Sequence, residues 1–341
     1  VLVLDDTQLQ GDVSIMDFAN PDIRFGIGID KLNADRYLPP KKEGGKARPA
    51  TPETVAAGAA TGLPVETLRA LKAKGDLLIG ELIISNARLT DVRFSIDAKD
   101  GNIKLAPVAA NLYEGKYEGD IHLDATGKLP RLTINTALKG IQAEPLLKDV
   151  TGKADLVGTG DFSVALIAAG NNVAALKQTL NGQGEIRFNK GILRGVDVKK
   201  MLEQAEIMLD NKQLGKIEKG GETPFDQLTG TLVITGGVVN NQDLLLTAPG
   251  FKVPGKGTLI NLNDMTWKYD MKVAVDEAGS TRGDKRYNLG GYEIPIQCRG
   301  EVDPDNCQPD YGGLLAAAGE KMVGDKLKEI INKKLGVEKQ Q

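Results

Sequence analysis

The sequence predicts a mainly β protein with a few helices, in which short strands form one elongated, twisted antiparallel sheet. Apolar and polar residues alternate with a period of two in many segments, as in strands that are buried on one side only. Glycine (41 residues) and proline (15 residues) separate these segments, and aromatic residues make up only 4% of the chain. A sheet with one solvated face favours antiparallel pairing, because parallel sheets are usually covered on both faces.

Five segments show the alternation most clearly, and each has one apolar side. These sides are Ile121, Leu123 and Ala125; Leu132, Ile134, Thr136 and Leu138; Phe162, Val164, Leu166 and Ala168; Ile186 and Phe188; and Tyr269, Met271, Val273 and Val275. Successive side chains of a strand point to opposite faces. Their neighbours, such as Thr133, Asn135, Ser163, Asp270 and Lys272, are therefore expected on the other, solvated face.

Three segments resemble one another and indicate an internal repeat: residues 80–89, 184–193 and 230–239. Each has the pattern of a strand, a short turn and a second strand. Gly191 and Gly237 hold matching turn positions, where a positive φ is often required. The repeat therefore predicts a meander of consecutive hairpins.

Helices are expected over residues 64–74, 145–149, 172–180, 196–214 and 311–335. The fourth is amphipathic, because Val198, Leu202, Ala205 and Leu209 recur at helical spacing. The last carries an apolar stripe of Val323, Leu327, Ile330 and Leu335 beside several lysines. We expect this C-terminal amphipathic helix to cap one end of the sheet. The alternative is a helix that lies on a membrane surface.

Residues 39–62 differ from the rest of the chain. They are rich in Pro, Ala, Gly, Thr and Lys and show no alternation. This composition predicts a flexible linker.

Charge and chain ends exclude some classes of protein. The net charge of −3 argues against a nucleic-acid partner, because phosphate binding requires clustered positive charge. No run approaches 18 consecutive apolar residues, so no transmembrane helix is expected within the chain. The chain opens with Val1 and lacks the pattern of a signal peptide. We interpret it as part of a longer protein, in which any anchor or export signal would lie upstream.

The two cysteines, Cys298 and Cys307, are separated by eight residues that include Gly300 and Pro304. Such a pair across a turn predicts a local disulfide and an oxidising compartment, although two unrelated thiols remain the alternative. A zinc site is not expected, because His122 is the only histidine and no further cysteine is present.

Residues 250–258 nearly match a phosphate-binding P-loop. Gly257 stands where that motif needs Ser or Thr, and a strand-like segment follows instead of a helix. We therefore interpret the segment as a β-turn and a strand.

Other polar groups are also expected to have a structural role. His122 lies between Asp120 and Asp124 on what we expect to be a solvated strand face. The acidic group of Asp303, Asp305 and Asp310 lacks the spacing of an EF-hand, so it predicts at most weak calcium binding. No nucleophile or metalloprotease motif occurs, and we expect no catalytic residue, no cofactor and no metal.

An ordered series of segments resembles the AsmA family of Gram-negative envelope proteins. It comprises residues 30–39, 63–69, 80–82, 100–107, 111–120, 140–147, 156–161 and 191–197. The resemblance implies attachment to the inner membrane by an N-terminal helix outside this chain, and a location in the periplasm. It also implies kinship with TamB and the bridge-like lipid transfer proteins, which bind lipid in a β-groove (a β-taco-like fold) with an apolar floor.

The resemblance suggests a division of the chain. Residues 1–38 would end a preceding set of groove repeats, 39–62 would be the linker, 63–310 the repeating β-groove domain, and 311–341 the C-terminal helix.

The expected function is to bind phospholipid acyl chains and to contribute to phospholipid transport and outer-membrane biogenesis. The residues expected to line the groove are Leu132, Ile134, Val164, Leu166, Met271 and Val273. Physical reasoning alone leaves an alternative open, because a sheet can also bury its apolar face by folding over on itself. The chain would then be a scaffold or chaperone-like module that contacts an outer-membrane or other envelope protein.

Overall fold

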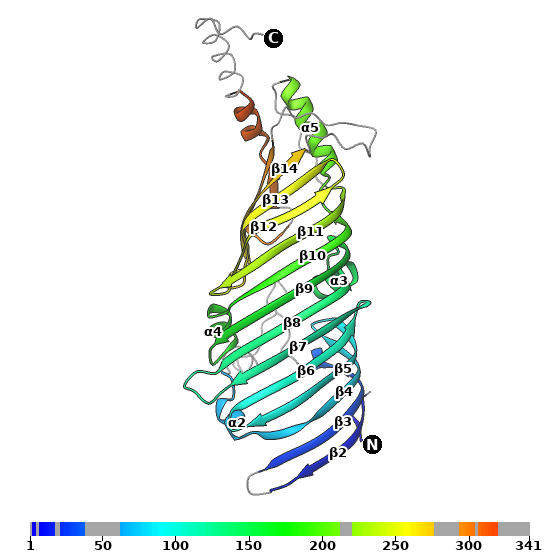
Figure 1. Ribbon diagram of the computed structural model, residues 1–341, viewed down its shortest axis with the longest axis vertical. Helices are drawn as coiled ribbons and strands as arrows, with labels where there is room; N and C mark the ends of the chain where they lie inside the picture. The colour runs from blue at the N-terminus through cyan, green and yellow to red at the C-terminus, as the bar shows by residue number, and fades with distance from the viewer. Residues whose placement is uncertain are drawn as a thin grey trace, which may run out of the picture.

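The structure, a computed structural model, describes residues 2–4, 7–17, 21–37, 62–211, 220–275, 293–303 and 306–319. In these residues sixteen strands form one long twisted sheet in which each strand lies beside its neighbours in the sequence (Figure 1). The sheet is not closed, since β1 and β16 are its two edges. The predicted fold class, mainly β with a few helices, is confirmed.

The first eight strands are β1 (Leu2–Leu4), β2 (Thr7–Ile15), β3 (Asp22–Asn33), β4 (Lys72–Ile84), β5 (Ala87–Lys99), β6 (Asn102–Leu112), β7 (Gly115–Asp124) and β8 (Arg131–Gln142). The others are β9 (Leu156–Ala169), β10 (Asn181–Arg194), β11 (Glu222–Thr235), β12 (Val238–Ala248), β13 (Phe251–Asn261), β14 (Thr266–Val275), β15 (Ile294–Glu301) and β16 (Cys307–Pro309). The P-loop-like segment is therefore mostly the strand β13, as predicted.

The described helices are η1 (Ala34–Arg36), α2 (Val65–Ala70), α3 (Ala143–Thr151), α4 (Val173–Gln178) and α5 (Val198–Asn211), and residues 311–319 are also helical. The α2 helix is shorter than predicted, because Lys72 already begins β4 and pairs with Asp22. The apolar stripe from Val323 to Leu335 lies outside the described residues. No helix in the described part of the chain is long and apolar enough to cross a membrane.

Two of the three similar segments, residues 80–89 and 230–239, contain hairpin turns as predicted. Ser85 and Asn86 join β4 to β5, and Gly236 and Gly237 join β11 to β12, all with positive φ. Such two-residue turns match the twist of the strands that they connect. The prediction for residues 184–193 is wrong: this segment is part of the continuous strand β10, and an irregularity between Asn189 and Ile192 takes up the extra residue as a bulge.

One strand pair differs from the predicted antiparallel pattern. β3 and β4 are parallel, in register from Asp22 opposite Lys72 to Asn33 opposite Ile83, whereas the other neighbouring strands pair antiparallel. A parallel pair needs a crossover connection. Here the connection contains η1 and α2 together with the predicted linker, of which residues 39–61 lie outside the described residues.

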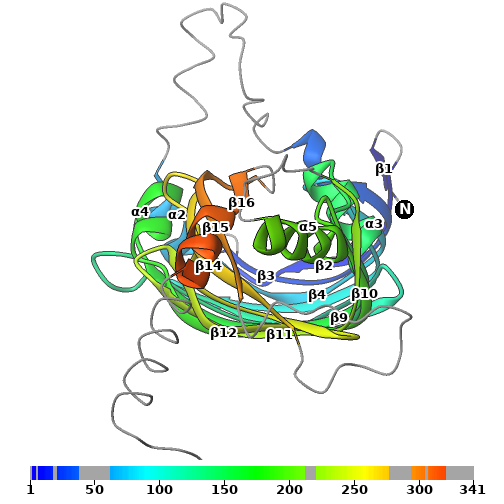
Figure 2. The same cartoon turned by 90° about the horizontal axis from the view of Figure 1, so that it is seen from above.

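Seen from above, the sheet is curved, and α5 lies on its concave side (Figure 2). The α2 and α4 helices lie along one long side of the sheet, and α3 lies along the other (Figures 1 and 2). The largest hydrophobic cluster lies where α5 meets the C-terminal strands. The structure therefore places its largest packed cluster at one end of an elongated sheet.

Candidate functional site

One face of the sheet is apolar over most of its length. We call it the apolar face and define it by residues that share one side of the strands: Ile27, Leu77, Phe94, Val108, Ile121, Leu123, Leu132, Ile134, Val164, Leu166, Ile186 and Leu232. The registers connect them from strand to strand, as Ile27 lies opposite Leu77, Leu77 opposite Phe94, and Phe94 opposite Val108. Further along, Ile121 lies opposite Ile134, and Ile134 opposite Leu166.

Four of the six predicted lining residues lie together on the apolar face. Leu132, Ile134, Val164 and Leu166 are all half-buried, on the adjacent strands β8 and β9. Val164 and Leu166 pack against a cluster that contains Leu232. Their chain neighbours point the other way, since Thr133 pairs with His122 on the polar side of the sheet.

Met271 and Val273 lie in a different environment. They are on β14, opposite Ile296 and Ile294 of β15, and belong to the cluster beneath α5. Val273 is fully buried. The structure therefore does not bring these two residues together with the four on β8 and β9.

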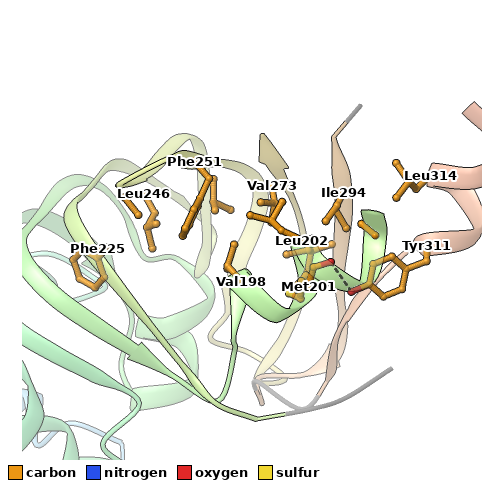
Figure 3. Close-up of a cluster of buried hydrophobic side chains, with 14 of the residues drawn as sticks. Val198, Met201, Leu202, Phe225, Leu246, Phe251, Val273, Ile294, Tyr311 and Leu314 are labelled. Carbon is orange, nitrogen blue, oxygen red and sulfur yellow. Dashed lines mark hydrogen bonds between the residues drawn. The ribbon is translucent and has the colours of Figure 1, made fainter. Parts of the chain in front are cut away.

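The sequence predicted α5 as an amphipathic helix but did not place it on the sheet. Its buried side consists of Val198, Met201, Leu202, Ala205 and Met208. These residues pack against Phe225, Leu246, Phe251, Val253 and Val273 of the strands (Figure 3). The helical spacing of apolar residues in the segment was the available signal, but its partner surface comes from strands that follow it in the chain.

Glycines on the apolar face lie next to aromatic rings of neighbouring strands. Gly75 is opposite Phe25, Gly160 opposite Phe188, and Gly191 opposite Phe225. In each pair a Cβ on the glycine would collide with atoms of the ring. Close approach of a ring to the neighbouring backbone thus requires glycine at these positions.

A polar network around the buried side chains of Asn241 and Tyr269 crosses the strands β11, β12 and β14. Tyr269 donates its hydroxyl to Asn241 Oδ1 at 2.5 Å, and Asn241 Nδ2 donates to the Thr231 carbonyl at 2.7 Å and to Asp243 Oδ1 at 2.8 Å. Burial raises the pKa of the Tyr269 hydroxyl. Burial alone would also raise the pKa of Asp243, but hydrogen bonds from Thr231 and Asn241 outweigh it and lower that pKa. Every polar group named here has a partner, which makes the network structural.

The polar face carries a hollow of about 930 Å³ that crosses from β6 to β11. Its lining includes Glu118, Asn135, Ser163 and Glu185 of the polar side, together with parts of Val108, Val164 and Leu232. Neither Ile134 nor Leu166 contributes to the hollow, so it is distinct from the row of apolar side chains across β7 to β9.

The residues considered for chemistry have ordinary structural partners. His122 Nε2 lies 3.1 Å from Asn102 Oδ1, and Asp303 pairs with Lys153 at 2.9 Å. The described residues contain no group of three or more metal-ligating side chains. Asp305 lies outside them.

The predicted disulfide between Cys298 and Cys307 is confirmed, with an S–S distance of 2.04 Å. It joins directly opposite residues of β15 and β16. Cys298 is fully buried and lies directly opposite Tyr269 of the neighbouring strand β14.

Comparison with known proteins gives one family. The model of the AsmA family matches residues 2–244, which end within β12. Protein AsmA of Escherichia coli (strain K12) is 23% identical over 313 residues, which cover 87% of this chain and 49% of that protein. AsmA family protein YhjG of the same organism is 23% identical over 158 residues, or 46% of this chain and 22% of that one.

The chain thus spans about half the length of the first relative and less of the second. Neither name is that of an enzyme. No solved structure gives a significant match.

Proposed function

Since this chain belongs to the AsmA family, we propose that its apolar face binds the acyl chains of phospholipids in the Gram-negative cell envelope. In the full-length protein, an N-terminal anchor outside this chain would hold it at the inner membrane, with the sheet in the periplasm. Lipid bound along the sheet would then move between the inner and outer membranes and contribute to outer-membrane biogenesis. No catalytic step is needed.

The observation that carries the proposal is the half-buried apolar row across β7, β8 and β9. Ile121, Ile134 and Leu166 lie side by side, and each is only partly covered by the protein. An apolar surface of this extent gains free energy when it is removed from water. Each methylene of a bound acyl chain would contribute about 0.8 kcal/mol on burial.

The dimensions also support an acyl chain as the ligand. The apolar side of β8 runs from Leu132 to Leu138, which corresponds to about 20 Å at roughly 3.3 Å per residue. One leaflet of a bilayer holds its acyl chains within about half of a ~30 Å hydrocarbon core. A lipid tail therefore fits across the face, with the polar headgroup left at the rim.

The test begins with the purified chain and measures whether phospholipid co-purifies, by mass spectrometry of an organic extract. We expect phospholipid at a constant ratio to protein. A chain that yields none, and takes up none from vesicles, would contradict the proposal. If such a chain also elutes as a dimer, the apolar face would belong to a second copy.

A pair of variants separates a lipid surface from a packed core. Ile134→Glu places a carboxylate on the apolar face, where acyl chains would desolvate it at a cost of several kcal/mol. We expect this variant to fold, as measured by circular dichroism and thermal melting, but to lose bound lipid. The matched control is Thr133→Glu, which points to the polar side and should keep both the fold and the lipid.

The scaffold function remains the second candidate, because the C-terminal end of the sheet is packed by the protein itself. Val273, Ile294 and Leu202 are fully buried together there. If the whole apolar face behaves in this way, Ile134→Glu unfolds the chain, since water cannot reach the carboxylate. That outcome would favour a self-packed module that supports outer-membrane assembly.

A further inference from the structure

The apolar face is covered at its C-terminal end by α5. Val198, Met201, Leu202, Ala205 and Met208 of this helix are each at most 7% exposed. They lie against the apolar side chains of β11 to β15, in the position that a ligand would take on the same side of the sheet (Figure 3). Ligand and helix cannot occupy this part of the face together.

The other end of the same face is open to solvent. Val13 and Ile15 of β2 lie opposite Phe25 and Ile23 of β3, yet are 58% and 43% exposed. Between the two ends, Ile134 and Leu166 are half-buried. Small clusters bury single residues elsewhere on this face, such as Ile79 and Val92, which are 3% and 4% exposed. Coverage by a helix lying on the face is found in the described residues only where α5 packs on β11 to β15.

Several contacts hold α5 in place. The Thr223 hydroxyl, which is 2% exposed, accepts a hydrogen bond from the Val198 amide at 3.0 Å and donates to the Val196 carbonyl at 2.7 Å. From the other side, Tyr311 approaches the carbonyl of Met201 and the side chain of Gln204. The start of the helix is thus fixed to β11, and its middle is held by the C-terminal helical residues.

Moving α5 away would uncover two apolar surfaces, the helix and the strands beneath it. A lipid tail in its place would cover only the strands again, so the exchange is unfavourable. The helix behaves as part of the core.

We propose that the apolar face is a one-ended binding site, closed by α5, in which acyl chains extend as far as the half-buried Ile186 on β10 and no further. This inference rests on the proposed function. Met271 and Val273 then contact α5 instead of lipid. Lipid enters and leaves over the strands before β12, and it does not pass out over β13 to β15.

The test uses the full chain and phosphatidylethanolamine vesicles whose lipid carries a photoreactive diazirine in the acyl tail. After illumination, labelled peptides are mapped by mass spectrometry. We expect label on β8, β9 and β10, and none on Val253, Val273 or Ile294. Label on these three residues in folded protein would overturn the closed end while leaving lipid binding intact. If no peptide is labelled, the result contradicts lipid binding itself and therefore also this inference.

A variant tests whether α5 is the closure. Leu202→Ala shortens the fully buried side chain of the helix, and we expect label to appear at Val273 in the folded variant. Ile207→Ala is the matched control, since Ile207 lies on the same helix but is 59% exposed, and its labelling should equal the wild type. A folded Leu202→Ala protein with the wild-type pattern would show that something else closes the end. If Leu202→Ala does not fold, the labelling pattern of the wild-type protein alone tests whether the C-terminal end of the face is closed.

Discussion

At the scale of single residues, the apolar face depends on pairs in which a large side chain lies beside a small one. Phe188 lies over Gly160, and Phe225 lies over Gly191, so the rings meet the backbone of the next strand. Polar groups buried in the same end of the sheet, such as Asn241 and Tyr269, satisfy each other. The close packing leaves little room for substitution.

Gly160→Ala tests the first of these pairs. The added Cβ would collide with the ring of Phe188, and overpacking of this kind costs about 1–3 kcal/mol. We expect urea denaturation to show this loss in the free energy of unfolding. Gly127→Ala should be nearly neutral, since the nearest atom to its Cβ would be 3.8 Å away. Equal stability of the two variants would contradict the role of the ring.

The buried tyrosines predict sensitivity to alkaline pH. Burial raises the pKa of Tyr311 to about 12 and raises that of Tyr269 as well. In the unfolded chain these hydroxyls ionise near their ordinary value of 10, which favours unfolding at higher pH. Their contribution to stability is therefore complete below pH 10 and is lost as the pH rises towards and beyond 12.

The measurement is the tyrosinate absorbance together with circular dichroism during an alkaline titration. Tyr269 and Tyr311 should ionise only as the fold is lost. The double variant Tyr269→Phe, Tyr311→Phe should lose less stability between pH 9 and pH 12 than the wild type. The same pH dependence in both proteins would assign the alkaline effect to other groups.

At the scale of elements, short polar contacts decide how strands are joined. Asp35 of η1 accepts hydrogen bonds from the amides of Ser85 and Asn86, at 2.5 and 2.7 Å. Both turn residues have positive φ, so the carboxylate stabilises a turn that the backbone alone disfavours. Asp35 thereby connects the end of β3 to the β4–β5 turn, next to the parallel strand pair.

Asp35→Ala removes both acceptors, and hydrogen bonds to a charged group contribute about 1.5–3 kcal/mol each when buried. Because this site is partly exposed, we expect a total loss of about 1–2 kcal/mol in chemical denaturation. Asp35→Asn keeps one carbonyl oxygen as an acceptor, so its free energy of unfolding should lie between those of Asp35→Ala and the wild type. If Asp35→Ala is as stable as the wild type, the turn needs no such support.

The disulfide makes a similar prediction for the last hairpin. Cys298 and Cys307 close a short loop, and a loop of this length contributes about 2–3 kcal/mol by restricting the unfolded chain. Reduction under mild denaturant should release β16 and lower the melting temperature. The Cys298→Ala, Cys307→Ala variant should behave like the reduced wild type and no longer respond to reductant. A melting temperature that is unchanged by either treatment would contradict this contribution.

At the scale of the whole molecule, each described strand pairs only with its neighbours in the sequence, and the β3–β4 pair differs only in being parallel. Such a quasi-linear arrangement gains stability from local interfaces and does not unfold as one compact domain does. The largest cluster is at α5 and the C-terminal strands, whereas Val13 and Ile15 near the other end are exposed. Stability is therefore expected to be uneven along the sheet.

Native-state hydrogen exchange tests this gradient. The slowest amides should belong to β12–β14 and to α5, and the fastest strand amides to β1 and β2, because local opening depends on how much apolar surface it exposes. Leu202→Ala should increase exchange at the C-terminal end and leave β4 to β6 unchanged. Uniform protection along the sheet, or a uniform response to the variant, would show that the sheet unfolds as one unit.

The sequence alone determined which side of a strand each residue takes. The alternation of Thr133, Ile134 and Asn135 is enough to separate the faces, because the two-residue period is a property of the extended backbone itself. The disulfide and the hairpins at residues 85–86 and 236–237 were also predictable, since their partners are close in the chain. Short-range geometry fixes all of these features.

Only the tertiary structure decided the parallel pairing of β3 with β4, the continuous strand through residues 184–193, and the position of α5 over Val273. In each case the outcome depends on a surface that a distant segment supplies. β10 remains a strand across its bulge because β9 and β11 pair with it on both sides. The apolar stripe on α5 predicts that the helix must bury one side. The strands against which it packs are formed by residues that lie up to about a hundred positions later in the chain. Periodicity within the helix carries no information about those strands.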